Sequence, residues 1–193
     1  MKKYTIWLLA IVIAILVVAS SLSAANSPPV VGGIFPDIKL SIPKDSAGKS
    51  YLDLGLFGFG SFKIPEIKAR LVIVEIFSMY CPYCQREAPN VNQLYSKIEQ
   101  NPALKGKIKI IGIGAGNTAY EVETFKKKYN VPFPLFPDED YVIHKMVGEV
   151  RTPYFIGLKI NPDGSHQVIY SKLGGFEGVD QFLEMMVKLS GLQ

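Results

Sequence analysis

The sequence predicts one α/β domain with a central mixed β-sheet flanked by helices. Residues 71–77 form an apolar run that leads into a helical pattern, and residues 108–113 repeat this arrangement. Two strands joined by a helix in this way are expected to lie parallel. Nearer the C-terminus, residues 153–160 and 167–173 flank the sequence Asn-Pro-Asp-Gly, which is typical of an antiparallel hairpin. The parallel pair and the hairpin together make the sheet mixed.

The first strand and helix have clear patterns. Residues 71–77 are apolar on both alternating faces except at Glu75, as in a central strand that is covered on both sides. The following helix has Pro82 in its first turn, and we expect Pro89 to kink it. Its apolar stripe consists of Val91, Leu94, Tyr95 and Ile98.

The remaining elements follow from shorter signals. Thr118 and Glu121 form a capping box that predicts the start of the second helix. Residues 37–40 and 61–64 are expected to form short strands that extend the domain at its N-terminal side, and the glycine-broken stretch 51–60 has no clear assignment. The other expected elements are an edge strand at 133–136, a short helix at 141–147 and a last helix at 179–189.

The first 25 residues have the pattern of an export signal. Lys2 and Lys3 precede an apolar run at 6–19, and small residues suit cleavage after Ala25. The run of 14 residues is shorter than the roughly 20 that span a bilayer, although an uncleaved anchor over residues 4–20 stays open. We therefore expect an extracytoplasmic protein of the bacterial periplasm, soluble after cleavage or anchored to the membrane.

The expected domain organisation follows from this signal. Residues 1–25 are the signal or anchor, 26–36 a linker or lead-in rich in Pro and Gly, and 37–193 the folded domain. The whole chain has a formal charge of +4, and because residues 1–25 hold two lysines and no acid, the rest carries +2. Such a weak charge without a basic block does not support nucleic-acid binding.

Both cysteines of the chain, Cys81 and Cys84, lie at the start of the first predicted helix. There, unpaired N–H groups and the helix dipole stabilise a thiolate, the form that attacks disulfides. Cys84, one turn on, could resolve the mixed disulfide. A zinc site needs about four ligands, and the chain adds only His144 and His166, so we expect no metal. A structural disulfide across so short a loop would stabilise little.

The order of elements with a cysteine pair after the first strand resembles the thioredoxin fold. In detail the chain is similar to the TlpA/ResA-like redoxins. The sequence motifs that are usual in that family match residues 35–40, 126–134, 151–155 and 161–164. The resemblance implies thiol–disulfide exchange, with Cys81 as the attacking thiol, Cys84 as the resolving thiol and Pro153 as a cis-proline facing the pair. We expect no cofactor.

Departures from this family leave the direction of exchange open. That branch usually has tryptophan before the first cysteine, where this chain has Tyr80. Residues 75–78 with Cys-Pro-Tyr-Cys are closer to DsbA-like oxidases, and the dipeptide itself is similar to that of glutaredoxins. Because the dipeptide lacks histidine, no obvious cation stabilises the Cys81 thiolate, which favours a reductant.

Two residues outside the cysteine motif are candidates for the chemistry. A carboxyl at Glu75 in a covered strand has a raised pKa, so we hypothesise that it takes and returns the proton of Cys84. The alternative is a bulge that lets Glu75 reach solvent or a lysine. If Pro153 is cis, the backbone of Thr152 can pair with an extended substrate. The alternative is a trans proline that opens an edge strand.

The remaining site candidates lie around the cysteine motif. Glu87 could modulate the thiol pKa, or it could be a solvated helix residue. Tyr80, Pro82 and Tyr83 are expected to form a contact surface for the substrate together with Thr152 and Pro153.

These features predict an exported thiol–disulfide oxidoreductase that acts on protein disulfides, preferably as a reductant. Its expected partners are exported proteins with thiols or disulfides and a membrane or soluble electron donor. The alternatives are a DsbA-like oxidase, a thiol peroxidase and a non-enzymatic thiol-binding or chaperone module.

Overall fold

The structure is a computed structural model that describes residues 27–54 and 60–192. The predicted signal or anchor, residues 1–25, lies outside the described residues, as do residues 55–59, half of the glycine-broken stretch 51–60. No helix within the described ranges is long and apolar enough to cross a membrane.

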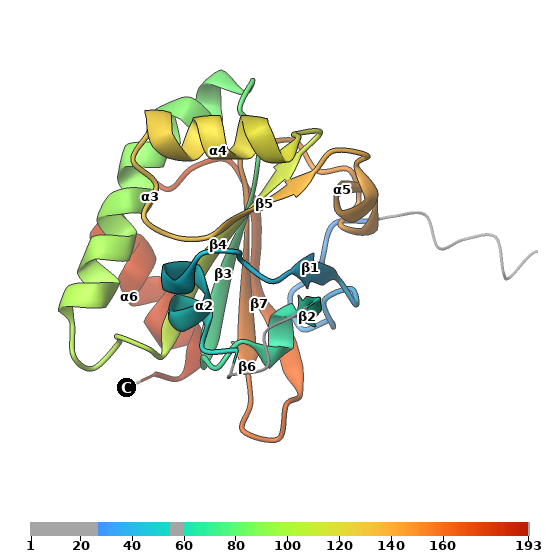
Figure 1. Ribbon diagram of the computed structural model, residues 1–193. Helices are drawn as coiled ribbons and strands as arrows, with labels where there is room; N and C mark the ends of the chain where they lie inside the picture. The colour runs from blue at the N-terminus through green and yellow to red at the C-terminus, as the bar shows by residue number, and fades with distance from the viewer. Residues whose placement is uncertain (1–26, 55–59, 193) are drawn as a thin grey trace, which may run out of the picture.

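A five-stranded mixed sheet forms the centre of the domain (Figure 1). Its strands follow the order β5-β4-β3-β6-β7. β3 and β4 are parallel, as are β4 and β5, whereas β6 runs antiparallel to both β3 and β7. The predicted mixed sheet, with its parallel unit and hairpin, is therefore confirmed. The strands are β3 (Leu71–Phe77), β4 (Ile108–Ala115), β5 (Leu135–Asp138), β6 (Tyr154–Ile160) and β7 (His166–Leu173).

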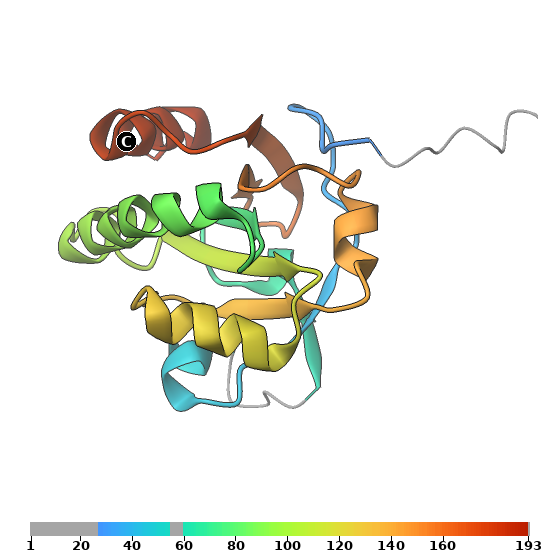
Figure 2. The same cartoon turned by 90° about the horizontal axis from the view of Figure 1, so that it is seen from above.

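Helices and a small second sheet cover the two faces, as the view from above shows (Figure 2). On one face lie the helices α3 (Pro82–Gln100), α4 (Ala119–Lys128) and α6 (Val179–Ser190). On the other lie the antiparallel pair β1 (Lys39–Ser41) and β2 (Ser61–Lys63), a 3₁₀ turn (Ile64–Glu66) and the short helix α5 (Val142–Met146).

Strand β3 shows why the sequence folds in this way. All seven of its residues are buried, since both faces of the strand are covered. Alternate side chains of a strand point to opposite faces. Leu71, Ile73 and Phe77 accordingly pack with α3 and α6, and Val72 and Val74 pack on the β1–β2 side. Glu75 has the same parity as Ile73 and lies on the α3 face.

One helix was not expected from the sequence. α2 (Ser46–Leu52) begins at Asp45, whose carboxylate accepts the backbone N–H of Gly48 at 2.6 Å. The helix places the Tyr51 hydroxyl 2.8 Å from the backbone N–H of Ile110, at a part of β4 that β5 does not reach. α2 therefore supplies the hydrogen-bond partner for a backbone N–H at this part of the sheet edge.

Several boundaries also differ from the sequence expectations. The first short strand lies at Lys39–Ser41 rather than 37–40, and the edge strand lies at Leu135–Asp138 rather than 133–136. In both places the strand is defined by its pairing partner: Leu40 pairs with Phe62, and Leu135 pairs with Gly112. Helix α3 continues through Pro89 to Gln100.

The lead-in that precedes the domain, of which the structure describes residues 27–36, packs against the domain. Gly32 donates its N–H to Val168 of β7 at 2.8 Å, and Gly33 accepts the Val168 N–H at 2.9 Å. The side-chain amide of Gln167 adds a bond to the Gly32 carbonyl. Residues 32–33 thus pair with the outer edge of β7.

Gly148 is expected to be necessary for this docking. It has a φ of +81°, and a Cβ there would lie 2.4 Å from the backbone of Ser27 and Pro28. Gly148→Ala should destabilise the protein by more than the roughly 1–2 kcal/mol of positive-φ strain alone, and should make residues 27–36 sensitive to protease. Thermal unfolding and limited proteolysis would measure both effects.

Gly164→Ala is the matched control for Gly148→Ala. Gly164 has a φ of +84° but no atom within 4 Å of the position of a Cβ, so it carries the strain without the collision. Equal effects of the two variants would contradict the role of Gly148 in docking the lead-in.

Candidate active site

The two cysteines lie at the junction of β3 and α3, where the sequence predicts them. Cys81 is the N-cap of α3 and Pro82 occupies the first turn. The N–H of Cys81 donates to the Ser78 carbonyl at 3.1 Å, and the Cys81 carbonyl accepts the N–H of Gln85 at 3.1 Å. Because proline has no N–H to satisfy, Pro82 suits the start of a helix.

The two thiols have different environments. Both are free, with Cys81 partly exposed and Cys84 fully buried. Burial acts to raise the pKa of Cys81, but hydrogen bonds from the Thr152 side chain, the Cys84 N–H and thiol, and the Tyr83 N–H outweigh it and leave the pKa below its ordinary value. Burial, reinforced by the charge of Glu75, raises the pKa of Cys84 far above its ordinary value. Cys81 is therefore the more readily ionised thiol.

The Thr152–Pro153 peptide bond is cis, as the resemblance implies, so the alternative of a trans proline is wrong. Thr152 lies next to Cys81: the Cys81 Sγ lies 3.2 Å from the Thr152 carbonyl oxygen. The Pro153 carbonyl accepts the N–H of Gly174 at 2.8 Å, which ties this turn to the end of β7.

Glu75 is buried on the α3 face of β3, with 3 % of its surface exposed. Its Oε1 has no hydrogen-bond partner among the described residues, and it forms no ion pair with any of them, so the alternative of a bulge or a lysine partner is not observed. Burial, then the charges of Glu87 and Cys81, raise the pKa of Glu75 to about 8. A group that titrates near neutral pH can both accept and donate a proton.

Glu87 is a half-buried residue rather than a solvated one. Its carboxylate accepts the backbone N–H of Phe176 at 3.2 Å and the side-chain amide of Asn90 at 3.3 Å. Burial raises the pKa of Glu87. Since its charge also raises the pKa of Glu75, Glu87 and Glu75 belong to one electrostatic group.

The two tyrosines of the motif have different surroundings. Both are about two-thirds exposed. Tyr83 lies under the guanidinium of Arg86, 4.4 Å from the ring centroid. Tyr80 points away towards α4, where its hydroxyl donates to Glu121. Tyr83 lines the same cavity as Pro153, whereas Tyr80 contacts the start of α4.

Asn117 supports the site and was not singled out in the sequence. It is fully buried, and its Oδ1 accepts the backbone N–H of Met79 at 2.8 Å. Its Nδ2 donates to the Gly116 carbonyl and reaches the Ser78 hydroxyl. Gln85 donates to the Met79 carbonyl at 2.8 Å. These two side-chain amides fix the loop before Cys81. The role of Asn117 was not recognisable from the sequence, because an Asn that follows a strand is also typical of an ordinary turn.

An open cavity of about 480 Å³ lies beside the cysteines. Thr152 and Pro153 form the wall next to Cys81, and the half-buried Glu87 also lines the cavity. The remaining lining residues are Tyr83, Arg86, Arg151, Leu173, Gly174 and Gly175. This cavity gives a substrate room next to the exposed thiol.

Comparison with known proteins agrees with this geometry. The AhpC/TSA family matches residues 31–167, which is more than half of the chain. The chain belongs to this family. It is 27 % identical over 128 residues to the thiol-disulfide oxidoreductase ResA of Bacillus thuringiensis, covering 66 % of this chain and 68 % of that protein. ResA of Halalkalibacterium halodurans is 25 % identical, covering 65 % and 68 %.

Solved structures of other proteins share the fold. A putative thiol:disulfide interchange protein DsbE from Chlorobium tepidum matches with a TM-score of 0.60 and 16 % identity, over 86 % of this chain and 99 % of that one. A secreted disulfide oxidoreductase of Mycobacterium tuberculosis, homologous to DsbE of E. coli, matches with a TM-score of 0.52 and 18 % identity, over 67 % and 90 %. The expected thioredoxin fold, redoxin family and enzyme class, a thiol–disulfide oxidoreductase, are thereby confirmed.

Proposed function

We propose that the protein reduces disulfides of exported proteins through the Cys81/Cys84 pair. The observation that carries this proposal is the contrast between the two thiols, a partly exposed Cys81 with a lowered pKa and a buried Cys84 with a raised one. In such a pair the Cys81 thiolate can attack a disulfide, while Cys84 stays protonated until the mixed disulfide has formed. Neither a peroxidase nor a passive binding module is favoured by the relatives, which are named for disulfide exchange.

The proposed reaction has two steps. The Cys81 thiolate attacks one sulfur of the client disulfide, and the other client sulfur leaves as a thiolate that takes a proton. Glu75 then accepts the proton of Cys84, whose sulfur attacks Cys81 and releases the second client thiolate. The client gains two electrons, and Cys81 and Cys84 become a disulfide that an external dithiol donor must reduce.

The substrate contacts in this proposal come from the cavity wall. An extended client segment would pair with the backbone of Thr152 beside Pro153, as a strand added to an edge. Pro82 and Tyr83, both exposed at the start of α3, would contact it from the other side, with Tyr80 at the border towards α4. Glu87 would modulate the site through Glu75, because its charge raises the Glu75 pKa.

The environment of Cys81 supports the direction of the reaction. No Lys, Arg or His in the described ranges lowers the pKa of Cys81, and the causes that lower it are all hydrogen bonds. A strongly stabilised thiolate makes an oxidant, as in DsbA. With hydrogen bonds but no cation, the disulfide form is favoured relative to DsbA, which suits a reductant.

Export is part of the proposal. Residues 1–25 have the charged, apolar and small-residue order of a signal segment, and one structural neighbour is described as secreted. The client proteins and the electron donor would then be extracytoplasmic, with residues 4–20 as a possible tether.

Cys84→Ala is expected to accumulate mixed disulfides between Cys81 and client proteins, because the resolving sulfur is missing. Non-reducing electrophoresis of extracts would show the adducts, and dithiothreitol should release them. Cys81→Ala is the matched control and should form none. Adducts in both variants, or in neither, would contradict the assigned roles.

The redox potential tests the direction separately. We expect equilibration with glutathione to place the Cys81/Cys84 couple nearer thioredoxin, at about −270 mV, than DsbA, at about −120 mV. A value near that of DsbA would identify an oxidase.

A further inference from the structure

The cavity beside Cys81 carries unpaired positive charge. Arg86 and Arg151 both line it, and both are exposed. Neither forms an ion pair with any carboxylate in residues 27–54 and 60–192. Arg86 stacks on the Tyr83 ring, 4.4 Å from its centroid, which holds its guanidinium at the cavity rim.

Among the described residues, Glu87 is the one acid that lines the cavity, and it does not neutralise these arginines. The carboxylate of Glu87 accepts the N–H of Phe176 and the amide of Asn90. Burial raises its pKa, and no arginine contributes to that shift. A Cβ on Gly175 would lie 2.2 Å from Glu87 Oε2, so the carboxylate is packed against the 174–176 loop. The charge that faces a ligand in this cavity is therefore positive.

A residue that lines the cavity, Thr152, is in direct contact with the reactive sulfur of Cys81. The Thr152 carbonyl oxygen lies 3.2 Å from Cys81 Sγ. An extended chain advances about 3.3 Å per residue. A client whose cysteine is bonded to Cys81 would therefore place a residue one or two positions away within reach of Arg86 and Arg151.

We propose that Arg86 and Arg151 select client disulfides in which an acidic side chain lies within two residues of the attacked cysteine. This inference rests on the proposed exchange reaction and names its substrate class. Arginine pairs with a carboxylate through two parallel N–H donors. An acidic client residue would gain this contact in the mixed disulfide, and a lysine in its place would be repelled.

The test uses three oxidised peptide homodimers that differ only beside the cysteine, with Asp, Ser or Lys. Single-turnover rate constants for oxidation of the reduced protein would be measured by acid quench and mass spectrometry. We expect the Asp peptide to react on the order of fivefold faster than the Lys peptide, as for an exposed ion pair. The ratio of the Asp-peptide rate constant to the Lys-peptide rate constant should decrease in 0.5 M salt, because salt screens the charges.

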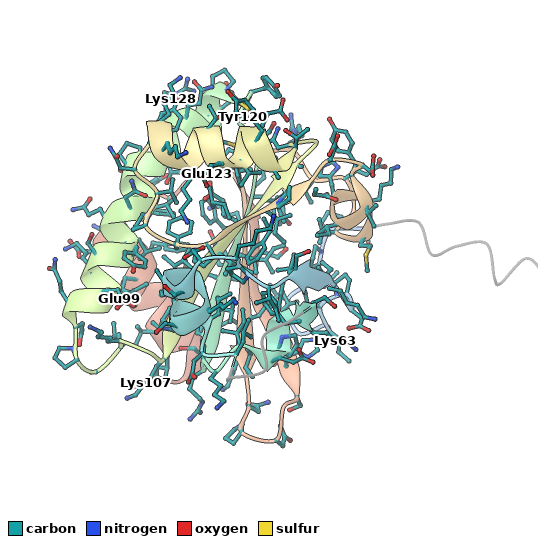
Figure 3. All side chains as sticks on the ribbon, in the orientation of Figure 1. Lys63, Glu99, Lys107, Tyr120, Glu123 and Lys128 are labelled. Carbon is teal, nitrogen blue, oxygen red and sulfur yellow. The ribbon has the colours of Figure 1, made fainter. Side chains whose placement is uncertain are left out.

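Charge reversal provides the decisive comparison. The double variant Arg86→Glu/Arg151→Glu should invert the Asp-to-Lys ratio, and each single variant should move it part of the way. The matched control is Arg70→Glu/Lys188→Glu, which changes the net charge equally. Arg70 precedes β3 at the end of the sheet opposite the cysteines, and its N–H bonds the carbonyl of Lys107, which is labelled in Figure 3. Lys188 lies in the last turn of α6, and neither residue lines the cavity. The control should keep the wild-type ratio.

The outcomes separate the two proposals. If the wild-type protein reduces none of the peptides, including the Ser peptide, the exchange reaction itself is wrong. If it reacts with the Ser peptide but shows no Asp-to-Lys preference, the acidic-client inference is wrong. The same holds if the double arginine variant keeps the wild-type ratio, or if the control variant inverts it. Because intrinsic peptide reactivity is common to all variants, the change in ratio reports the protein alone.

Discussion

Glu75→Gln is expected to slow the second step of exchange by about 10²-fold, the range of general acid–base catalysis. The buried Cys84 has a strongly raised pKa, so its sulfur needs a base at the moment of attack. Glu75 has a pKa of about 8, and its ionised form is that base. In the wild-type protein the resolution rate should therefore rise with pH through about 8, and in the variant this rise should disappear.

The measurement isolates that step. A mixed disulfide between Cys81 and a small aromatic thiol can be formed first, and release of the thiol then followed between pH 6 and 9. Glu87→Gln is the matched control: it removes a charge that raises the Glu75 pKa, so it should shift the rise to lower pH without abolishing it. A rise near pH 8 that survives in Glu75→Gln would exclude Glu75 as the base.

Glu75→Gln is also expected to change the pH dependence of the free energy of unfolding. The pKa of Glu75 is about 8 in the folded protein, against an ordinary value of 4.5. Between these values the folded state keeps a proton that the unfolded chain releases, so the free energy of unfolding falls as pH rises. The slope is about 1.4 kcal/mol per pH unit. This stabilisation is complete below pH 4.5 and lost above about 8.

Urea unfolding of the reduced protein would show this slope. Glu75→Gln lacks the titrating group, so the stability difference between wild type and variant should change steadily from pH 5 to pH 8, in favour of the variant at higher pH. A constant difference would show that the pKa of Glu75 is not raised in the folded protein. Slower resolution together with this pH-dependent difference would identify a buried acid that costs stability and serves the chemistry.

Local patterns explain what the sequence could predict. Neighbouring residues alone define the run at Leu71–Phe77, the capping box at Thr118 and the cysteine pair at the start of α3, so these features are recognisable in the sequence. Glu75 was identifiable as a buried acid because it interrupts an otherwise apolar strand. In these cases local preference and the final fold agree.

Tertiary contacts explain what was missed. Helix α2 contains Gly48, which disfavours a helix, yet a Cβ there would lie 2.8 Å from Pro43. The helix is also held by the bond of Tyr51 to Ile110, a residue 59 positions away. The cavity likewise combines α3, the turn before β6 and the end of β7. The spacing of residues within one segment contains no information about contacts between segments that are distant in the sequence.

Asn117→Ala is expected to weaken the site from a position that touches neither thiol. It leaves the N–H of Met79 without its partner, Asn117 Oδ1 at 2.8 Å. An unsatisfied buried donor costs about 1–3 kcal/mol, which denaturant unfolding would measure. Because the loop that ends at Cys81 loses an anchor, the hydrogen bonds that lower the Cys81 pKa should lengthen, and that pKa should return towards its ordinary value.

The pH profile of Cys81 alkylation by iodoacetamide distinguishes positioning from plain stability. Asn92→Ala provides the control, since Asn92 lies on α3, bonds the Tyr129 carbonyl at 2.8 Å and is far from the thiols along the helix. Both variants should lose stability, but only Asn117→Ala should move the alkylation profile to higher pH. If both profiles match the wild type, the lowered pKa arises from α3 and Thr152 without the Met79 loop. If both move, the thiol senses global stability, and Asn117 has no specific positioning role.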